Sequence, residues 1–213
     1  MNYSCWNKCT VVSLVLVLLG LWGDAFAQGT WTNKTPMPTG LQGPSVGVID
    51  GKLYVASGCC PEFSSPPFPR FNTLQVYDPA ADSWTEKAPI PVALFAAPSG
   101  VTSIGEKLYV AGGQADQAHG NNISTLQIYD ATTDAWTTGA SLPAAGGGAF
   151  GGVINGKLYV AGGQDPANIS EVSSAQVYDP STDTWTSLAP LPSPRSGGGS
   201  AVINGILYAV GGP

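Results

Sequence analysis

The sequence carries little charge, and basic residues are especially few. Asp, Glu, Lys and Arg make up 10% of the 213 residues, and 8 basic against 14 acidic side chains give a net charge of −6. Because nucleic-acid binding needs a basic surface patch, we expect no nucleic-acid partner. Hydrophobic residues make up 43% of the chain, which excludes a disordered protein of low hydrophobicity and high charge.

Residues for metal and thiol chemistry are also scarce. The one histidine is His119, and the four cysteines are Cys5, Cys9, Cys59 and Cys60. Since one histidine cannot form a multi-histidine metal site, we expect no metal and no cofactor. The Cα atoms of the adjacent Cys59 and Cys60 lie about 3.8 Å apart, closer than in most disulfides. Free thiols, a strained vicinal bridge and a bond to another chain all remain open for this pair.

Glycine and proline, in contrast, are abundant, with 28 and 18 residues. They are the two worst helix formers, so the composition argues against a helical bundle. It favours a turn-rich, all-β protein instead.

The first 27 residues have the pattern of a secretory signal peptide. Lys8 precedes an apolar run over residues 11–22, and Ala25 and Ala27 place small residues at a signal-peptidase site. The apolar run is short for a membrane span. We therefore predict a signal peptide over 1–27 and a secreted, periplasmic or extracellular chain over 28–213 without a membrane span. An uncleaved N-terminal anchor is the alternative.

A repeat of about 50 residues fills the rest of the sequence. Tryptophan recurs in each copy, tyrosine recurs in Gln-Val-Tyr-Asp or Gln-Ile-Tyr-Asp, and paired glycines follow Leu-Tyr-Val-Ala or its variant. We assign these residues to core packing, inter-blade packing or close backbone approach: Trp31, Trp84, Trp136, Trp185, Tyr77, Tyr129, Tyr178, Gly112, Gly113, Gly162, Gly163, Gly211 and Gly212. Counted from one tryptophan to the next, the repeat units are about 31–83, 84–135, 136–184 and a partial 185–213.

The order of motifs within one unit resembles the kelch repeat. A hydrophobic strand is followed by Asn-Gly, Leu-Tyr-Val, Gly-Gly, Val-Tyr-Asp-Pro and Trp, and a period near 50 fits that family. The resemblance covers essentially all of residues 28–213. It implies an all-β fold, a kelch-type β-propeller whose four-stranded antiparallel blades each come from one repeat.

Each repeat contains four short β-prone runs, which we call strands a to d. In the third copy these are 151–154, 157–161, 174–178 and 135–138, of which the last comes first in the chain. Three of the a–b turns are type I′ signals, whereas Gly105-Glu106 suits a type II′ turn. We interpret the aspartates at the c–d turns as turn formers rather than as metal ligands or catalysts.

The strand count predicts three complete units with partial ends. A d-type strand over 30–34 comes first, and only a and b strands, over 200–203 and 206–210, come last. This arrangement suggests that both ends of the chain share one blade. Since kelch propellers resemble rings of about six blades, we interpret the sequence as a truncated or incomplete ring. A compact four-bladed ring with one incomplete blade is the alternative.

One face of such a propeller is the candidate binding face. Because strands alternate in direction, the b–c and d–a loops share one face, and the short a–b and c–d turns share the other. The b–c loops over 59–72, 114–124 and 164–173 differ completely in sequence, and binding residues usually lie on variable loops. The ligand-binding candidates on this face are Phe68, Arg70, Gln114, Asp116, His119, Gln164, Asp165 and Arg195. N-glycosylation patterns begin at Asn33, Asn122 and Asn168.

The pattern favours a secreted, non-enzymatic module that binds a protein or a carbohydrate with this loop face. We assign no catalytic residue. The resemblance extends to the galactose-oxidase-like superfamily, whose propellers carry kelch-type repeats, but their copper site needs two histidines, which His119 alone cannot supply. A metal-independent sugar-processing enzyme, such as a sialic-acid-mutarotase-like propeller, is one alternative, although no catalytic residue maps from it onto this sequence. A fragment without independent function is the other.

Overall fold

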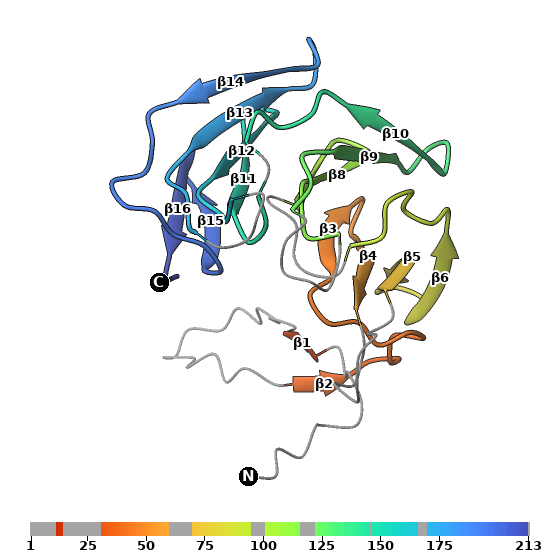
Figure 1. The fold of residues 1–213 in the computed structure, drawn as a ribbon. Coiled ribbons are helices and arrows are strands. Elements are labelled where there is room, and N and C mark those ends of the chain that lie inside the picture. Colours follow the sequence, from red (N-terminus) through yellow and green to blue (C-terminus); the bar gives the residue numbers. More distant parts are fainter. Residues whose placement is uncertain are drawn as a thin grey trace.

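The computed structural model describes residues 12–14, 31–59, 70–94, 101–115, 122–144, 146–165 and 170–212. Within these ranges all regular elements are β-strands (Figure 1). No helix in this part of the chain is long and apolar enough to cross a membrane.

Three four-stranded antiparallel sheets follow one another along the chain. Blade 1 consists of β3 (Ser45–Ile49), β4 (Lys52–Cys59), β5 (Arg70–Asp78) and β6 (Ser83–Lys87). Blade 2 consists of β7 (Val101–Ile104), β8 (Lys107–Ala111), β9 (Leu126–Asp130) and β10 (Ala135–Gly139). Blade 3 consists of β11 (Phe150–Ile154), β12 (Lys157–Ala161), β13 (Ala175–Asp179) and β14 (Thr184–Leu188). Two-stranded sheets are formed by β1 (Val12–Leu14) with β2 (Trp31–Asn33), and by β15 (Gly199–Ile203) with β16 (Ile206–Val210).

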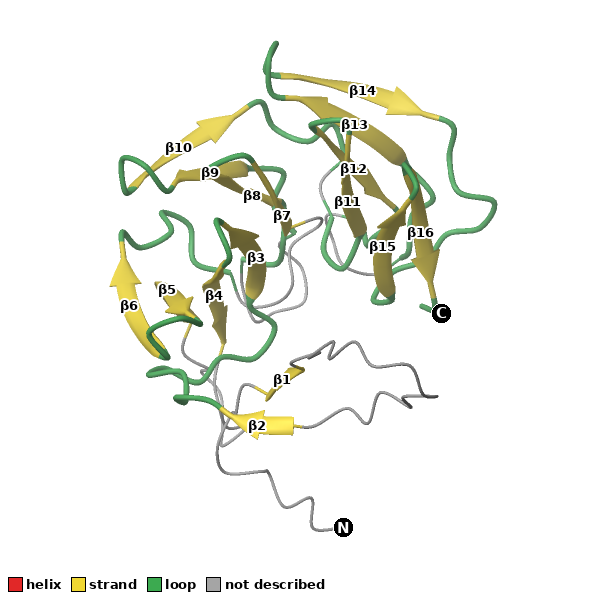
Figure 2. Cartoon of the chain, turned by 180° about the vertical axis from the view of Figure 1, so that it is seen from behind, coloured by secondary structure: helices red, strands yellow, loops and turns green. Residues whose placement is uncertain are grey.

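The blades stand side by side in an arc (Figures 1 and 2). Their first strands contact one another in succession, β3 with β7, β7 with β11 and β11 with β15. The fourth strands, β6, β10 and β14, lie on the outside of the arc (Figure 1). The expected fold class, an all-β propeller with four-stranded antiparallel blades, is confirmed.

One strand assignment from the sequence is wrong. The run over 135–138, which we grouped with the third repeat, is β10 and pairs with β9 in blade 2. A tight turn between Asp130 and Asp134 folds β10 back on β9, so that Trp136 lies opposite Tyr129. The fourth strand of blade 3 is β14, which pairs with β13 in the same way.

The expected shared blade is not formed by the described strands. β2 pairs with β1, with Thr32 opposite Ser13, whereas β15 pairs with β16. β1 lies inside the predicted signal peptide. It pairs with β2 in the place where a complete blade would have its strand c. Trp31 on β2 is 69% exposed. Trp31 therefore does not pack in the way that we assigned to it, because β1, the described strand that pairs with β2, carries no tyrosine.

The backbone confirms the predicted hairpin turns. Asp50 and Gly51 have φ of 47° and 69°, and Asn155 and Gly156 have φ of 51° and 73°. Type I′ turns require positive φ at both central residues, which Asn or Asp followed by Gly accepts at low cost. Gly105 has φ of 56°, whereas Glu106 is not among the residues with positive φ, as a type II′ turn requires.

Apolar side chains fill the space between neighbouring blades. Blades 1 and 2 bury a cluster that includes Ile49, Tyr54, Leu74, Ile90, Leu108 and Tyr129. Blades 2 and 3 bury a second cluster that includes Tyr109, Leu126, Leu142, Leu158 and Tyr178. The core of this protein thus lies between sheets, as expected for a repeat array in which each unit contacts only its neighbours.

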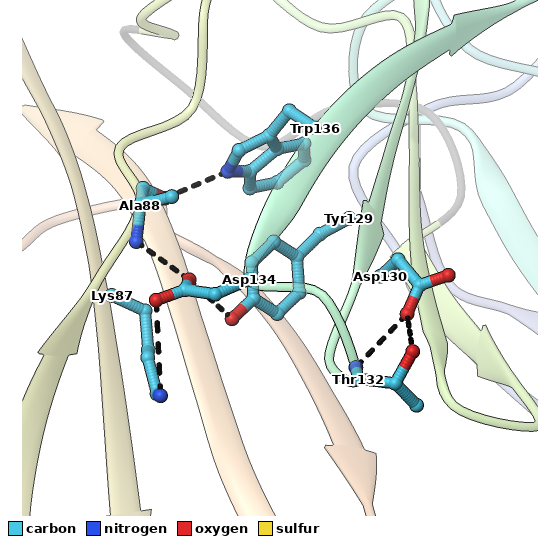
Figure 3. A network of polar contacts seen from close by, with 7 residues as sticks. All are labelled: Lys87, Ala88, Tyr129, Asp130, Thr132, Asp134 and Trp136. Atoms are coloured by element: carbon cyan, nitrogen blue, oxygen red, sulfur yellow. Dashed lines mark hydrogen bonds and ion pairs between the residues drawn. The ribbon is translucent and has the colours of Figure 1, made fainter.

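The recurring Tyr, Asp and Trp form a polar clamp between blades, seen for blade 2 in Figure 3. Asp134 Oδ1 accepts hydrogen bonds from the Tyr129 hydroxyl at 2.8 Å and from the Ala88 N–H at 2.9 Å. Trp136 Nε1 donates to the Ala88 carbonyl at 2.7 Å. Both main-chain groups of Ala88, the residue that directly follows β6, are therefore held by blade 2.

The same clamp occurs three times. Asp82 and Trp84 hold Thr35, and Asp183 and Trp185 hold Ala140. A second aspartate in each c–d turn accepts local main-chain N–H groups and pairs with the lysine that begins strand b. This geometry agrees with the interpretation of these aspartates as structural.

Candidate functional site

The paired glycines fix the base of each b–c loop. Gly113 N donates to the Gly146 carbonyl at 3.2 Å, and Gly163 N donates to the Arg195 carbonyl at 2.8 Å. Each bond joins the end of strand b to the d–a loop that precedes the next blade. Gly162 has φ of +68°, and a Cβ atom there would lie 2.5 Å from the Arg195 carbonyl oxygen. The close backbone approach therefore depends on glycine.

In the first copy Ser57 and Gly58 replace the paired glycines, and strand b is again bonded to the d–a loop before the next blade. Gly58 N donates to the Leu94 carbonyl at 3.1 Å. Ser57 has a positive φ of 56° and is buried. Its hydroxyl oxygen accepts the Leu94 N–H at 2.6 Å and donates to the Phe71 carbonyl at 2.9 Å. These bonds compensate for a backbone conformation that is costly for a residue with a Cβ atom.

Arg70 joins the b–c loops of blades 1 and 2. It is the first residue of β5, and its Nη1 donates to the carbonyl of Ala115 in the next loop. The guanidinium group is thus held at the loop face by a neighbouring blade.

The b–c loop of blade 2 is joined to that of blade 3 by Asn122. Asn122 pairs with Gln114 across the loop base, and its Nδ2 donates to the Asp165 carbonyl at 2.7 Å. Both Gln114 and Asn122 are buried. Sequence reasoning placed Asn122 only in an N-glycosylation pattern, but a buried amide bound to another loop is not presented as an acceptor. The repeated spacing of b–c loop bases was the signal that could have found it.

Gln164 and Asp165 lie at the corresponding base in blade 3. Gln164 pairs with Glu171 across the loop, and its N–H donates to the Gly147 carbonyl at 3.0 Å. Asp165 N donates to the Ser170 carbonyl at 2.9 Å, which closes the loop. Both candidates are half-buried at the rim of the loop face.

Arg195 lies in the d–a loop between blade 3 and β15. Its Nη2 donates to Ser193 Oγ at 2.8 Å, and its side chain is half-buried. Its carbonyl receives the Gly163 N–H described above, so the main chain that carries this guanidinium group is anchored to blade 3.

The remaining candidates, Phe68, Asp116 and His119, lie outside the described residues, as does Cys60. Cys59 is buried, and its thiol lies 3.7 Å from Gln42 Oε1. Across the described ranges no group of three or more His, Cys, Asp or Glu is arranged to hold a metal ion.

The structure thus connects successive loops into one rim on the b–c and d–a face. We call loop rim the set Arg70, Gln114, Ala115, Asn122, Gln164, Asp165 and Arg195. Arg70, Asn122 and Arg195 each take part in a contact with a loop of an adjacent blade. Five of the eight candidates lie in this set. The arrangement can present guanidinium, amide and carboxylate groups together to a polar ligand.

The sequence is similar to several curated kelch proteins. It is 32% identical over 143 residues to Kelch-like protein terF of Aspergillus terreus, which covers 64% of this chain and 30% of terF. It is 35% identical over 130 residues to F-box/kelch-repeat protein At1g67480 of Arabidopsis thaliana, covering 61% of this chain and 33% of that protein. It is 28% identical over 146 residues to human Kelch repeat and BTB domain-containing protein 12, covering 62% and 23%. The chain therefore spans a third or less of the length of these relatives.

A solved structure shares the fold. YjhT superposes with a TM-score of 0.74 at 21% sequence identity, over 89% of this chain and 64% of that one. The kelch motif model matches residues 41–91, 96–143 and 146–192, which contain all four strands of blades 1, 2 and 3 respectively. The chain belongs to the kelch-repeat family.

Proposed function

We propose that this chain is an exported binding module that recognises a protein or a carbohydrate with its loop rim. The observation that carries the proposal is the joining of successive b–c loops, Arg70 to Ala115 and Asn122 to Asp165. These contacts fix the described ends of loops of unrelated sequence on one face, and a fixed binding surface lowers the entropic cost of binding.

The opposite face offers less for recognition. Its a–b and c–d turns repeat nearly the same residues, and their aspartates are engaged in the inter-blade clamp or in local turns. Turns that repeat nearly the same residues offer little that distinguishes one ligand from another. The variable groups available for a ligand are therefore concentrated on the loop rim.

The experiment is a screen of the purified chain on glycan and peptide arrays. We expect binding that is weakened at least about tenfold in Arg70→Ala and in Arg195→Ala. Glu106→Ala is the matched control, because Glu106 is an exposed charged residue in an a–b turn on the other face. Circular dichroism checks that each variant is folded. Absence of binding on both arrays, or an equal loss of binding in Glu106→Ala, contradicts the proposal.

Export is a separate part of the proposal and has its own test. The motivation is the Lys8, apolar run and Ala25-Phe26-Ala27 pattern. When the full chain is expressed in a secreting host, mass spectrometry of the exported protein should show Gln28 as its first residue. A product that stays in the cytoplasm or keeps Met1 contradicts export through this segment.

A further inference from the structure

Two of the a–b turns consist of an asparagine followed by a glycine. Asn155-Gly156 joins β11 to β12, and the same pair, Asn204-Gly205, joins β15 to β16. We consider the turn of blade 3, because this blade has a sheet on each side and its first strand β11 contacts both β7 and β15. Asn155 and Gly156 are exposed on the face opposite the loop rim. The turn is therefore open to solvent with both neighbouring sheets in place.

The main chain of this turn lies outside the sheet. The strand register ends at the pair Ile154 and Lys157, so Asn155 and Gly156 do not belong to the paired strands. A Cβ atom at Gly156 would meet no atom beyond its chain neighbours within 4 Å. The Gly156 nitrogen and the Asn155 carboxamide are thus adjacent groups that both lie in open space.

This arrangement permits an intramolecular reaction of asparagine. The Gly156 nitrogen attacks Cγ of Asn155 and forms a new N–Cγ bond. The carboxamide nitrogen leaves as ammonia and takes the Gly156 N–H proton with it, so that a succinimide ring remains. Water from the solvent then opens the ring: attack at Cγ gives aspartate, whereas attack at the main-chain carbonyl carbon gives isoaspartate. Glycine favours ring closure, because it has no side chain to hinder the attack and its backbone is conformationally permissive.

Blade 1 shows that the aspartate product fits this turn. Asp50-Gly51 joins β3 to β4 with φ of 47° and 69°, compared with 51° and 73° at Asn155-Gly156. The strands on either side of the two turns have the same register. Conversion of Asn155 to aspartate therefore reproduces an arrangement that is already present in this protein.

The new carboxylate also has a favourable neighbour. The pKa of Lys52 is raised, first by its hydrogen bond with Asp78 and in smaller part by the charge of Asp50. Lys157 is paired in the same way with Asp179, at 2.8 Å, and this pairing raises the pKa of Lys157. A carboxylate at position 155 adds negative charge beside Lys157, as Asp50 does beside Lys52.

The isoaspartate product does not fit the turn. It routes the main chain through Cβ and Cγ, which adds one carbon atom and about 1.5 Å to the path between Ile154 and Lys157. The strands on both sides are held in the core, where Phe150 and Leu158 are 1% and 0% exposed. A type I′ turn has room for two residues of ordinary length. The added carbon must therefore open the turn, next to the pair of Lys157 with Asp179.

We propose that Asn155 is a site of spontaneous deamidation in the folded protein. Its succinimide opens to an aspartate form that keeps the β11–β12 turn and to an isoaspartate form that disrupts it. Asn33 and Asn72 are the other exposed asparagines of the described strands that lack a following glycine. They are followed by lysine and threonine, whose side chains hinder the attack of the main-chain nitrogen. These two residues therefore provide internal controls.

Peptide mapping by mass spectrometry tests the proposal. The purified full chain is kept folded in a mildly alkaline buffer, and samples are digested in mild acid, which stops the reaction. We expect the peptide with Asn155 to gain about one dalton, at a rate at least about tenfold higher than the peptides with Asn33 and Asn72. Two products should form. One coelutes with the peptide from Asn155→Asp, and the other is a substrate of an isoaspartyl methyltransferase.

Asn155→Asp is the matched control for the effect on the fold. It has the new carboxylate without the additional main-chain carbon, so it should melt at the same temperature as fresh wild type. Aged wild type should melt at a lower temperature, in proportion to its isoaspartate content. Equal destabilisation of Asn155→Asp and of aged wild type contradicts the assignment of the two products.

Three outcomes of the peptide map overturn the proposal. Equal rates at Asn155, Asn33 and Asn72 would show that the turn gives no advantage. A mass gain without isoaspartate would indicate direct hydrolysis of the carboxamide rather than ring closure. A mass gain that occurs only in urea would show that the folded turn prevents the reaction.

Discussion

Gln127 holds both main-chain groups of Val92, a residue of the preceding d–a loop. Its Oε1 accepts the Val92 N–H at 2.8 Å, and its Nε2 donates to the Val92 carbonyl at 3.2 Å. Gln127 is fully buried. Gln75 holds Thr39 in the same two-way manner in blade 1. The glutamine of Gln-Val-Tyr-Asp or Gln-Ile-Tyr-Asp thus forms a second inter-blade clamp. The residue that it holds lies four positions after the residue that Asp and Trp hold.

Gln127→Leu should therefore destabilise the protein. The substitution removes two hydrogen bonds and leaves the Val92 main chain unpaired beside an apolar side chain, at a cost of about 1–3 kcal/mol. Urea unfolding followed by tryptophan fluorescence measures the change. Thr138→Ala, opposite Gln127 on β10 but exposed, is the control and should leave the midpoint nearly unchanged. Equal effects of the two substitutions would contradict the clamp.

Gly162→Ala should cost more than Gly156→Ala. Both glycines have φ near +70°, so a side chain at either site carries the left-handed penalty of about 1–2 kcal/mol. At Gly156 a Cβ meets nothing within 4 Å, whereas at Gly162 it meets the Arg195 carbonyl oxygen. We expect an additional loss of about 1–3 kcal/mol at Gly162 from this overlap. Thermal unfolding of both variants measures the difference, and equal melting temperatures would show that the close approach is unimportant.

Replacement of Trp136 by alanine should destabilise the protein far more than the same replacement of Trp31. Trp136 packs 5.3 Å from the Tyr129 ring and donates to Ala88, so Trp136→Ala should lose about 2–3 kcal/mol. Trp31 is exposed, and Trp31→Ala should change stability by less than about 0.5 kcal/mol. The denaturant concentrations at the unfolding midpoints of the two variants measure this difference in stability. A large effect at Trp31 would mean that β2 packs against other strands in solution.

The aspartates of the c–d turns should lose their stabilising effect in acid. The pKa of Asp134 is held below its usual value, first by the Ala88 N–H and then by the Tyr129 hydroxyl. The pKa of Asp179 is lowered to about 2 by Lys157, with help from Ser181. A carboxyl whose pKa is depressed on folding stabilises the protein above the unfolded value of about 3.9 and loses that contribution as the pH falls through the folded value. Near-ultraviolet circular dichroism should thus change between about pH 4 and pH 2.

Asp134→Asn provides the control for this acid transition. An amide in place of the carboxylate does not titrate, so the variant should be less stable at neutral pH and should lose less stability on acidification. The comparison uses the unfolding midpoints of the variant and of the wild type, measured at neutral pH and again in acid. An acid response identical to that of the wild type would show that other groups control it.

Much of the local structure followed from residue order. Asn-Gly and Asp-Gly predicted the hairpin turns, and the 50-residue period predicted the blades, because both depend on contacts between residues close in sequence. The candidate loop face was also predictable, since strand alternation fixes which loops share a side. Asn122 was missed because its function depends on Asp165, which belongs to the next repeat.

The sequence by itself determined the repeat, the turn types, the four strands of a blade and the face on which the variable loops gather. Tertiary structure alone decided that β10 belongs to blade 2 and that Trp31 is exposed. The physical reason is the range of the interactions. Backbone conformation and side-chain alternation are set over a few residues, whereas strand partners and burial depend on neighbouring blades about 50 residues away.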